Sequence, residues 1–140
     1  MRPATLAQTA ERVASGQSVD KALAEFLDEF YLAATLERQI PMLTEEPSLT
    51  GDARVDGLLG AVAEYLAHQF NLPKVPAWAY SPVRYLDHAW HASSMADDGL
   101  REYLTFASPA EFASRNIFTE ERPLRRARGP QPAKTQIKSA

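Results

Sequence analysis

Residues 18–34 read SVDKALAEFLDEFYLAA and hold the strongest helical pattern in the chain. Apolar side chains recur there at intervals of three and four residues: Val19, Leu23, Phe26, Leu27, Phe30, Tyr31 and Ala34. This spacing is typical of an amphipathic helix that buries one face. Ser18 precedes the stripe and can accept a hydrogen bond from the first free N–H groups, so we predict that the helix begins there. A one-sided helix of this length needs a partner element, which predicts a helical domain.

Two further helices are expected, one on each side of this segment. Residues 5–15 carry a short apolar stripe and are followed by Gly16, a residue typical of helix C-termini. Residues 53–70 carry a longer stripe, and Thr50 or Asp52 can cap its start. We expect the two long helices to pack on each other, because each must bury its apolar face.

The connections contain many prolines. Residues 41–52 (PMLTEEPSLTGD) are expected to form a loop, since they contain two prolines and turn-forming residues. Residues 71–78 (NLPKVPAW) are predicted to cross the helix pair in an extended conformation and to dock Trp78 on it, because prolines exclude a regular helix there. Ser81 and Pro82 then read as the cap and first residue of another short helix.

The C-terminal third predicts two more helices and a tail. One helix is expected over residues 100–106, and another over residues 109–115. Ser108 and Glu111 have the spacing of a capping box at the start of the second. Residues 119–140 lose periodicity and become basic, so we predict a flexible tail. The expected architecture is all-α, with about five helices over residues 1–118 and an extended proline-rich crossing.

Composition bounds the function. The chain has 140 residues, 45% of them hydrophobic and 24% charged, which suits one globular domain. It has no cysteine, which excludes disulfides, thiolate metal sites and cysteine nucleophiles. The N-terminal residues lack the apolar core of a signal peptide, and the apolar runs are too short to span a membrane. We therefore expect a cytoplasmic protein that makes no membrane contact.

The net charge is divided between the two parts of the chain. Residues 1–118 hold 9 Lys and Arg against 16 Asp and Glu, whereas residues 119–140 hold 6 against 2. The polar side of the strongest helix carries Glu25, Asp28 and Glu29, which predicts a surface that meets a basic partner. The tail carries the basic cluster Arg122, Arg125, Arg126 and Arg128. This cluster can contact an acidic partner or phosphates, or remain solvated.

Two other binding modes are less well supported. A helix-turn-helix unit would place the strongest helix in a DNA groove, but its exposed residues are mainly acidic and would repel phosphates. Asp87, His88 and His91 lie close enough in sequence to share a metal ion if they are helical. The lone HxxH lacks the glutamate of metalloprotease motifs, so structural roles are favoured and no metal or cofactor is expected. No nucleophile elbow or phosphate loop is present, and we expect no enzymatic activity.

Much of the chain resembles a family of small bacterial proteins. The similar features are LPKVPAWAYSPVRYLDHAW from Leu72, LREYLTFASPAEFASRNIF from Leu100, and ALAEFLDEFY in the strongest helix. They include the Pro76-x-Trp78 crossing, Tyr85 with Trp90, and the run that ends at Phe118. Members of this family are encoded beside nucleotidyltransferase-like genes, in what look like toxin–antitoxin pairs. The similar residues are framework features, so the resemblance implies no active-site residue.

The resemblance implies an antitoxin-like protein that binds and neutralises a nucleotidyltransferase-type toxin. We expect Glu25, Asp28 and Glu29 to meet a basic groove of that partner. The aromatic residues expected to order the interface, and the arginines expected to clamp the partner, are Trp78, Tyr85, Trp90, Arg122, Arg125 and Arg126. The alternative is a transcriptional regulator whose basic tail contacts operator DNA.

Overall fold

The computed structural model describes residues 2–92, 107–120, 123–124 and 126. The described elements are α1 (Leu6–Ala14), α2 (Val19–Ala33), α3 (Leu36–Thr44), α4 (Ala53–Gln69), the 3-10 turns η1 (Ala77–Tyr80) and η2 (Pro82–Arg84), β1 (Trp90–His91), α6 (Ala110–Ala113) and β2 (Ile117–Phe118). This mainly helical architecture confirms the predicted all-α class. The helix predicted over residues 100–106 lies outside the described residues.

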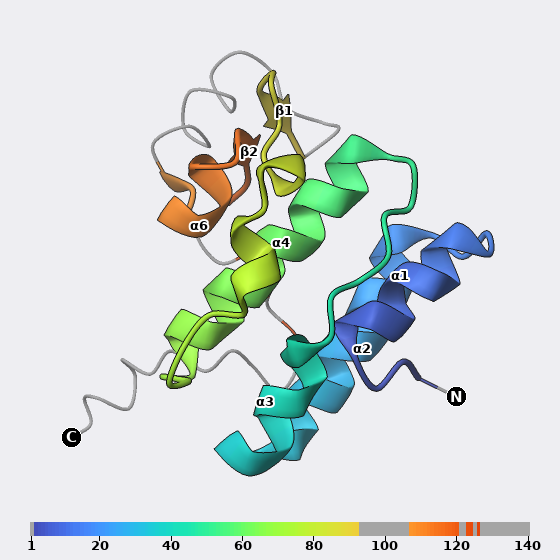
Figure 1. Cartoon of the computed structure of the whole chain (residues 1–140), viewed down its shortest axis with the longest axis vertical. Helices are drawn as coiled ribbons and strands as arrows, with labels where there is room; N and C mark the ends of the chain where they lie inside the picture. The colour runs from blue at the N-terminus through green and yellow to red at the C-terminus, as the bar shows by residue number, and fades with distance from the viewer. Residues whose placement is uncertain (1, 93–106, 121–122, 125, 127–140) are drawn as a thin grey trace.

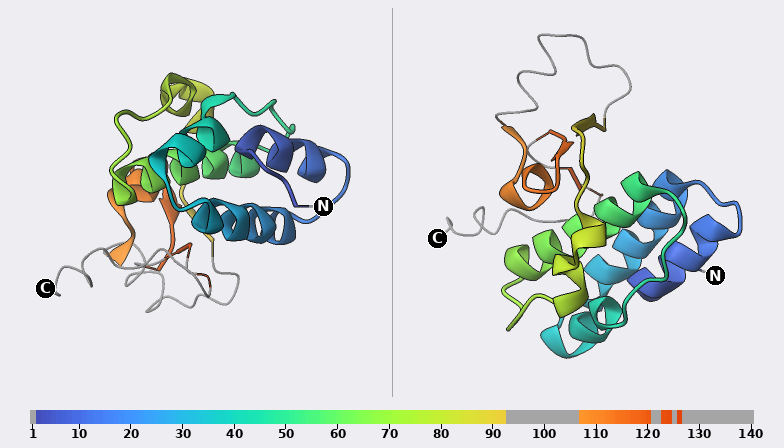
Figure 2. Two further views of the ribbon diagram at one scale, coloured as in Figure 1. Left: turned by 90° about the horizontal axis from the view of Figure 1, so that it is seen from below. Right: turned by 45° about the horizontal axis from the view of Figure 1, so that its top comes forward.

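Helix α4 lies at the centre of the domain. Figure 1 and the right view of Figure 2 show α1 and α2 on one side of it, and α6 with the two short strands on the other. The turns η1 and η2 pack along α4, and α3 contacts both α1 and α2. The central helix therefore joins an N-terminal group of helices to a C-terminal group of short elements.

The predicted helix starts are confirmed by their hydrogen bonds. The backbone N–H of Lys21 donates to the Ser18 hydroxyl over 3.1 Å at the start of α2. The N–H of Arg54 donates to the Asp52 carboxylate over 2.9 Å at the start of α4. Gly16 follows α1 with φ +111°, a conformation in which other residues are strained. Local capping thus fixes the entry to both long helices.

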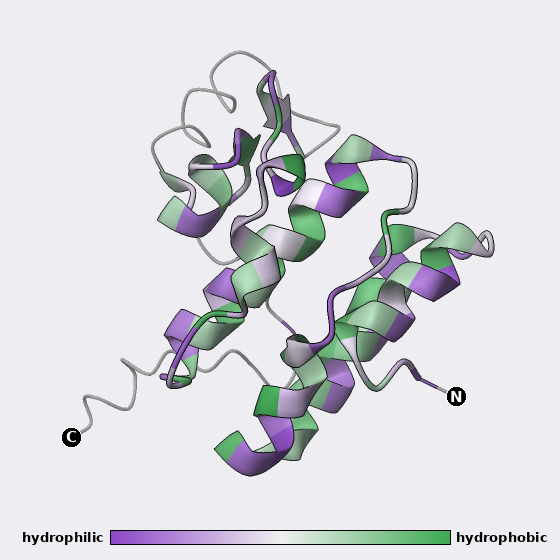
Figure 3. Cartoon of the chain, viewed as in Figure 1, coloured by the Kyte–Doolittle hydropathy of each residue, from purple (hydrophilic) through white to green (hydrophobic). Residues whose placement is uncertain are grey.

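The core forms where the apolar faces of α2 and α4 meet. Phe30 on α2 makes an edge contact with Phe70 at the end of α4, with ring centroids 5.3 Å apart. Tyr31 stacks on the same Phe70 ring at 5.7 Å. Figure 3 shows apolar and polar residues alternating along both helices, as the sequence stripes predict. We expected the two long helices to pack on each other, and the structure shows buried residues of both in one core cluster.

The prediction of a loop over residues 41–52 is wrong in its first part. Helix α3 runs through Pro41 and ends at Thr44. Proline removes one helical hydrogen bond, but tertiary contacts hold the helix on both sides of it. The Gln39 amide approaches the backbone of α2, donating to a carbonyl at 3.5 Å, and Leu43 is buried in the core. Thr35 caps the start through its hydroxyl.

The segment after the crossing is not the helix that was predicted. The turn η2 covers only Pro82–Arg84, and the chain then extends into β1. Strand β1 pairs in parallel with β2, with Trp90 opposite Ile117. The N–H of Trp90 donates to the Asn116 carbonyl over 2.8 Å. The pairing partner is distant in sequence, so no local periodicity could indicate it.

The predicted capping box at Ser108 is also wrong. Helix α6 has Pro109 at its N-cap position, and no side chain caps it. The Ser108 hydroxyl instead exchanges two hydrogen bonds with the Thr119 backbone, at 2.7 and 2.8 Å. Glu111 pairs with His68 on α4 instead of with its own helix start. Both residues of the expected box therefore make tertiary contacts.

Two residues within the predicted tail, residues 119–140, are buried in the structure. Leu124 is buried in the core, and the Tyr31 hydroxyl donates to its carbonyl over 3.0 Å. Thr119 is buried as well. Thr119 and Leu124 therefore pack on the helical domain, whereas Glu120 and Arg126 are exposed. Residues 127–140 lie outside the described part of the chain.

Candidate partner-binding surface

The three predicted carboxylates lie together on the polar side of α2. Glu25 lies about one turn before the neighbouring Asp28 and Glu29, and the three side chains are 30%, 27% and 38% exposed. Leu32 follows on the same face and is 44% exposed. In the structure these carboxylates lie on one surface, with an exposed apolar side chain beside them.

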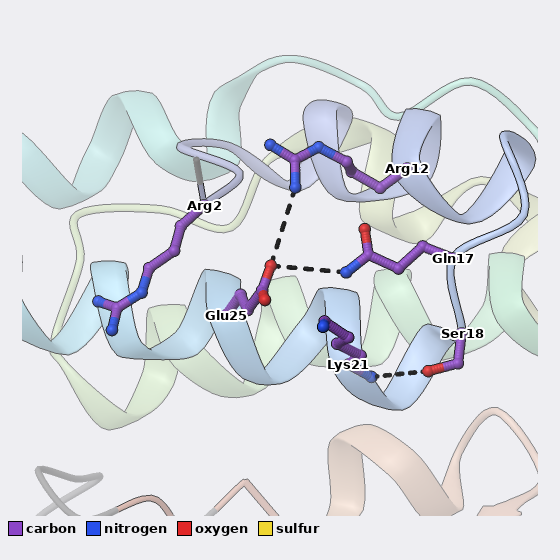
Figure 4. A pocket seen from close by; sticks show the side chains of 6 residues that line it. All are labelled: Arg2, Arg12, Gln17, Ser18, Lys21 and Glu25. Carbon is purple, nitrogen blue, oxygen red and sulfur yellow. Dashed lines mark hydrogen bonds and ion pairs between the residues drawn. The ribbon is translucent and has the colours of Figure 1, made fainter.

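Arginines of the same chain already pair with this surface. Arg2 approaches Glu29 with an N–O distance of 2.9 Å. Arg12 lies 3.8 Å from Glu25, and Gln17 donates to the same carboxylate over 3.5 Å. Arg2, Arg12, Gln17 and Glu25 line a hollow between α1 and the start of α2 (Figure 4), whose volume is about 600 Å³. The long distances at Glu25 leave this carboxylate the most loosely held of the three.

Asp28 makes the tightest of these contacts. The Arg126 guanidinium donates to it through two parallel hydrogen bonds, Nε to Oδ1 at 2.9 Å and Nη2 to Oδ2 at 3.0 Å. This fork geometry is the strongest form of arginine–carboxylate pairing. The hydrogen bond to Asp28 is the main cause of a raised pKa at Arg126. The predicted partner-binding residues Asp28 and Arg126 are therefore each other's partners in the free chain.

Tyr31 connects this contact to the core. Burial is the main cause that raises the pKa of its phenol well above the ordinary value of 10.0. The folded state therefore holds the phenol protonated at a pH where the unfolded chain ionises. This contribution to stability is complete below pH 10 and is lost as the pH rises above it.

We predict an alkaline loss of stability that depends on Tyr31. Above about pH 10 the free energy of unfolding should fall as the pH rises, in the native chain more steeply than in a Tyr31→Phe variant. The difference between the two slopes should reach up to about 1.4 kcal/mol per pH unit. At neutral pH the variant should lose about 1 kcal/mol, because its hydrogen bond to Leu124 is gone. Urea unfolding between pH 8 and 11.5 measures both effects. The control is Tyr80→Phe, at an exposed tyrosine, which should lose nearly as much stability at alkaline pH as the native chain. The same dependence of the free energy of unfolding on pH in Tyr31→Phe and the native protein would contradict the prediction.

A mainly apolar groove lies between α3 and the crossing. Its volume is about 490 Å³, and it is lined by Ile40, Leu43, Thr44, Glu46, Leu72, Pro73, Lys74, Pro76, Ala77 and Trp78. The Trp78 ring is buried there, and its indole N–H donates to the Leu43 carbonyl over 3.0 Å. The expected docking of Trp78 is thus confirmed, but on α3, which the sequence prediction did not contain.

Exposed apolar side chains lead toward this groove. Leu36 and Ile40 lie one turn apart on α3 and are 44% and 36% exposed. Ile40 also lines the groove, and Leu32 precedes the two in the last turn of α2. Contiguous exposed apolar residues beside a groove are typical of protein-binding surfaces.

The predicted aromatic residues are framework rather than exposed contacts. An arginine lies over each ring: Arg84 over Trp78 at 4.9 Å, Arg115 over Tyr85 at 4.5 Å and Arg54 over Trp90 at 5.3 Å. Trp78 is buried and the other two rings are half-buried. Stacked arginines hold these rings in place, which agrees with a role in ordering the crossing. The rings leave little exposed area for a partner.

Sequence reasoning missed two fully buried arginines. Arg84 donates to the carbonyls of Asp56 and Pro47, at 3.2 and 2.7 Å. Arg115 donates to the Glu64 carboxylate over 2.6 Å and to the Ala79 carbonyl over 2.7 Å. These cations join α4 to the loop before it and to the turns after it, so they hold the crossing that forms one wall of the groove.

The histidines of the YLDHAWH tract do not share a helical face. His91 lies in β1, and its ring stacks on Phe118 with centroids 5.3 Å apart. His88 is exposed in the preceding bend. Among the described residues, no group of three acidic or histidine side chains is arranged to hold a metal ion. The helical geometry on which the metal alternative depended is therefore absent.

Comparisons of the whole chain with known proteins found no match. The chain matches no protein-family description, no curated protein and no solved structure. No helix in the described ranges is both long and apolar enough to cross a membrane. Of the predicted tail residues, Arg122 and Arg125 lie outside the described residues.

Proposed function

We propose that the protein acts by binding and neutralising a partner protein, as an antitoxin-like inhibitor of a nucleotidyltransferase-type enzyme in the cytoplasm. The nature of the partner rests on the family resemblance. The observation that supports binding is the apolar surface formed by Leu36, Ile40 and the groove floored by Trp78. A surface of this kind suits an apolar anchor residue from a partner, which usually supplies most of the binding energy.

The charge around the groove indicates the chemistry of the partner. Glu46 lines the groove with a side chain that is 57% exposed, and it also lies 3.5 Å from the Arg84 guanidinium. Glu37 and Glu45 lie exposed on α3 and just after it, and Arg38 is the exposed cation beside them. Lys74 is the cation of the lining. The matching partner segment therefore combines an apolar anchor with basic flanking residues, consistent with the basic groove of an enzyme that handles nucleotides or nucleic acid.

The test uses a nucleotidyltransferase-type enzyme of the kind that the resemblance leads us to expect beside this gene. A Leu36→Lys/Ile40→Lys variant should bind it about 30-fold more weakly, because loss of central apolar anchors costs about 2 kcal/mol or more. Co-purification, calorimetric titration and rescue of growth measure the effect. Val83→Lys is the matched control, since Val83 is also exposed but does not line the groove. Unchanged binding by a folded double variant would reject this surface, and absence of any complex with the native chain would reject the proposed function.

The alternative of DNA binding through the tail gains no support from the described residues. Arg126, the described member of the basic cluster, is engaged by Asp28 and offers less free charge to a phosphate. DNA affinity that falls steeply with salt, and that disappears when Arg122, Arg125 and Arg128 are replaced by glutamine while the buried Leu124 is kept, would favour the regulator instead.

A further inference from the structure

The chain binds a short segment of itself on the flank of α2. We call this segment the arm and define it by Pro123, Leu124 and Arg126. The arm meets Asp28 and Tyr31, which lie three residues apart on α2. Arm and helix are separated by more than ninety residues in sequence, as the Arg126–Asp28 separation of 98 shows. The contact is therefore tertiary and has the form of a bound peptide.

Three kinds of contact define what this flank recognises. The Leu124 side chain is buried in the core cluster. The Tyr31 hydroxyl donates to the Leu124 backbone carbonyl over 3.0 Å, and the Asp28 carboxylate receives both hydrogen bonds of the Arg126 fork. The flank of α2 thus binds three groups together: an apolar side chain, the carbonyl of the same residue, and a guanidinium two residues later. The required ligand is a Leu-x-Arg segment, because lysine cannot form the fork and a charged residue cannot replace the leucine.

We infer that the flank of α2 around Asp28 and Tyr31 is a recognition site for a Leu-x-Arg segment of the partner, and that the arm occupies it in the free protein. That the segment belongs to a partner protein rests on the proposed function. Asp28 and Arg126 are 27% and 38% exposed, so a competing arginine can reach the carboxylate from solvent. The arm acts as a built-in competitor that a basic partner displaces.

Tethering explains why the free protein keeps its own arm in place. A tethered segment has an effective concentration on the order of millimolar, so a free peptide competes poorly with it. Release of the arm should uncover the site without altering α2. Leu36 and Ile40 lie on α3, whereas Asp28 and Tyr31 lie on α2, so the two sites can be changed separately.

The inference is tested with the chain's own segment supplied as a free peptide. The probe is a fluorescent peptide of residues 119–130, TEERPLRRARGP. The proteins are the full native chain and a full-length Leu124→Ala/Arg126→Glu variant, with Arg126→Glu alone as a second variant if the first unfolds. The released variants should bind the peptide about ten-fold or more tightly than the native chain, and the binding should weaken with salt.

A carboxylate-specific control accompanies this experiment. Adding Asp28→Asn to the released variant should reduce peptide binding about ten-fold, because the amide cannot accept the charged fork. Equal peptide affinity of native and released chains, or no effect of Asp28→Asn, would overturn the inference. A native dimer that Asp28→Asn dissociates would place the arm in a second copy and overturn the partner assignment. None of these results depends on the enzyme, so a failure here leaves the groove proposal standing.

Discussion

Replacing Arg115 with methionine is expected to lower the free energy of unfolding by about 3–5 kcal/mol. Its guanidinium is fully buried and donates to the Glu64 carboxylate and to the carbonyls of Glu111 and Ala79, at 2.6, 2.7 and 2.7 Å. Methionine fills similar volume but leaves a largely buried carboxylate and two carbonyls without this donor. Urea unfolding followed by circular dichroism at pH 7 measures the loss.

Two controls separate burial from charge. Arg126→Met removes an exposed arginine that also pairs with a carboxylate, and it should cost about 1 kcal/mol or less. Glu64→Leu added to Arg115→Met removes the stranded carboxylate and should recover part of the loss, since replacing both members of a buried pair is often close to neutral. If Arg115→Met costs no more than Arg126→Met, the buried guanidinium does not hold α4 to η1 and α6.

Helices α1, α2 and α4 could be predicted because their signals are local. Their apolar stripes repeat every three or four residues, and Ser18 and Asp52 mark two of the starts with side chains that accept backbone hydrogen bonds. Each signal lies within a few residues of the structure it predicts. The same is true of the crossing as far as Pro76, where prolines exclude a regular helix. Its predicted end was wrong, because Ala77 and Trp78 belong to the turn η1.

The missed elements depend on contacts between distant segments. Helix α3 passes through Pro41 because Leu43 is buried and its carbonyl receives the Trp78 indole N–H. Strand β1 exists because Asn116, with φ +66°, turns the chain so that its carbonyl meets the Trp90 N–H. Local sequence preferences oppose a helix at Pro41 and give no signal for strand β1, so tertiary packing determines both elements.

The candidate site was predicted in part for the same reason. The grouping of Glu25, Asp28 and Glu29 follows from helical spacing, whereas their arginine partners come from three other segments of the chain. A local signal for the buried arginines did exist in α4. Gly57 and Gly60 lie one turn apart in a helix, where glycine costs about 1 kcal/mol relative to alanine. A Cβ at Gly60 would lie 3.0 Å from the Arg84 Cβ, so close approach explains the choice.

Trp78→Ala is expected to cost about 3–5 kcal/mol of stability, since the substitution removes a large buried ring and leaves a cavity. Trp78→Phe keeps most of the ring volume but leaves the Leu43 carbonyl without its donor, and should cost about 1–2 kcal/mol. Fluorescence of the remaining Trp90 follows urea unfolding in both variants. Trp90→Ala, at a half-buried ring, is the matched control and should cost less than Trp78→Ala. Equal losses at the two positions would mean that α3 and the crossing are held by the groove's other residues. In that case the groove would keep its shape without the Trp78 ring. Partner affinity should then survive Trp78→Phe but be lost in Leu36→Lys/Ile40→Lys.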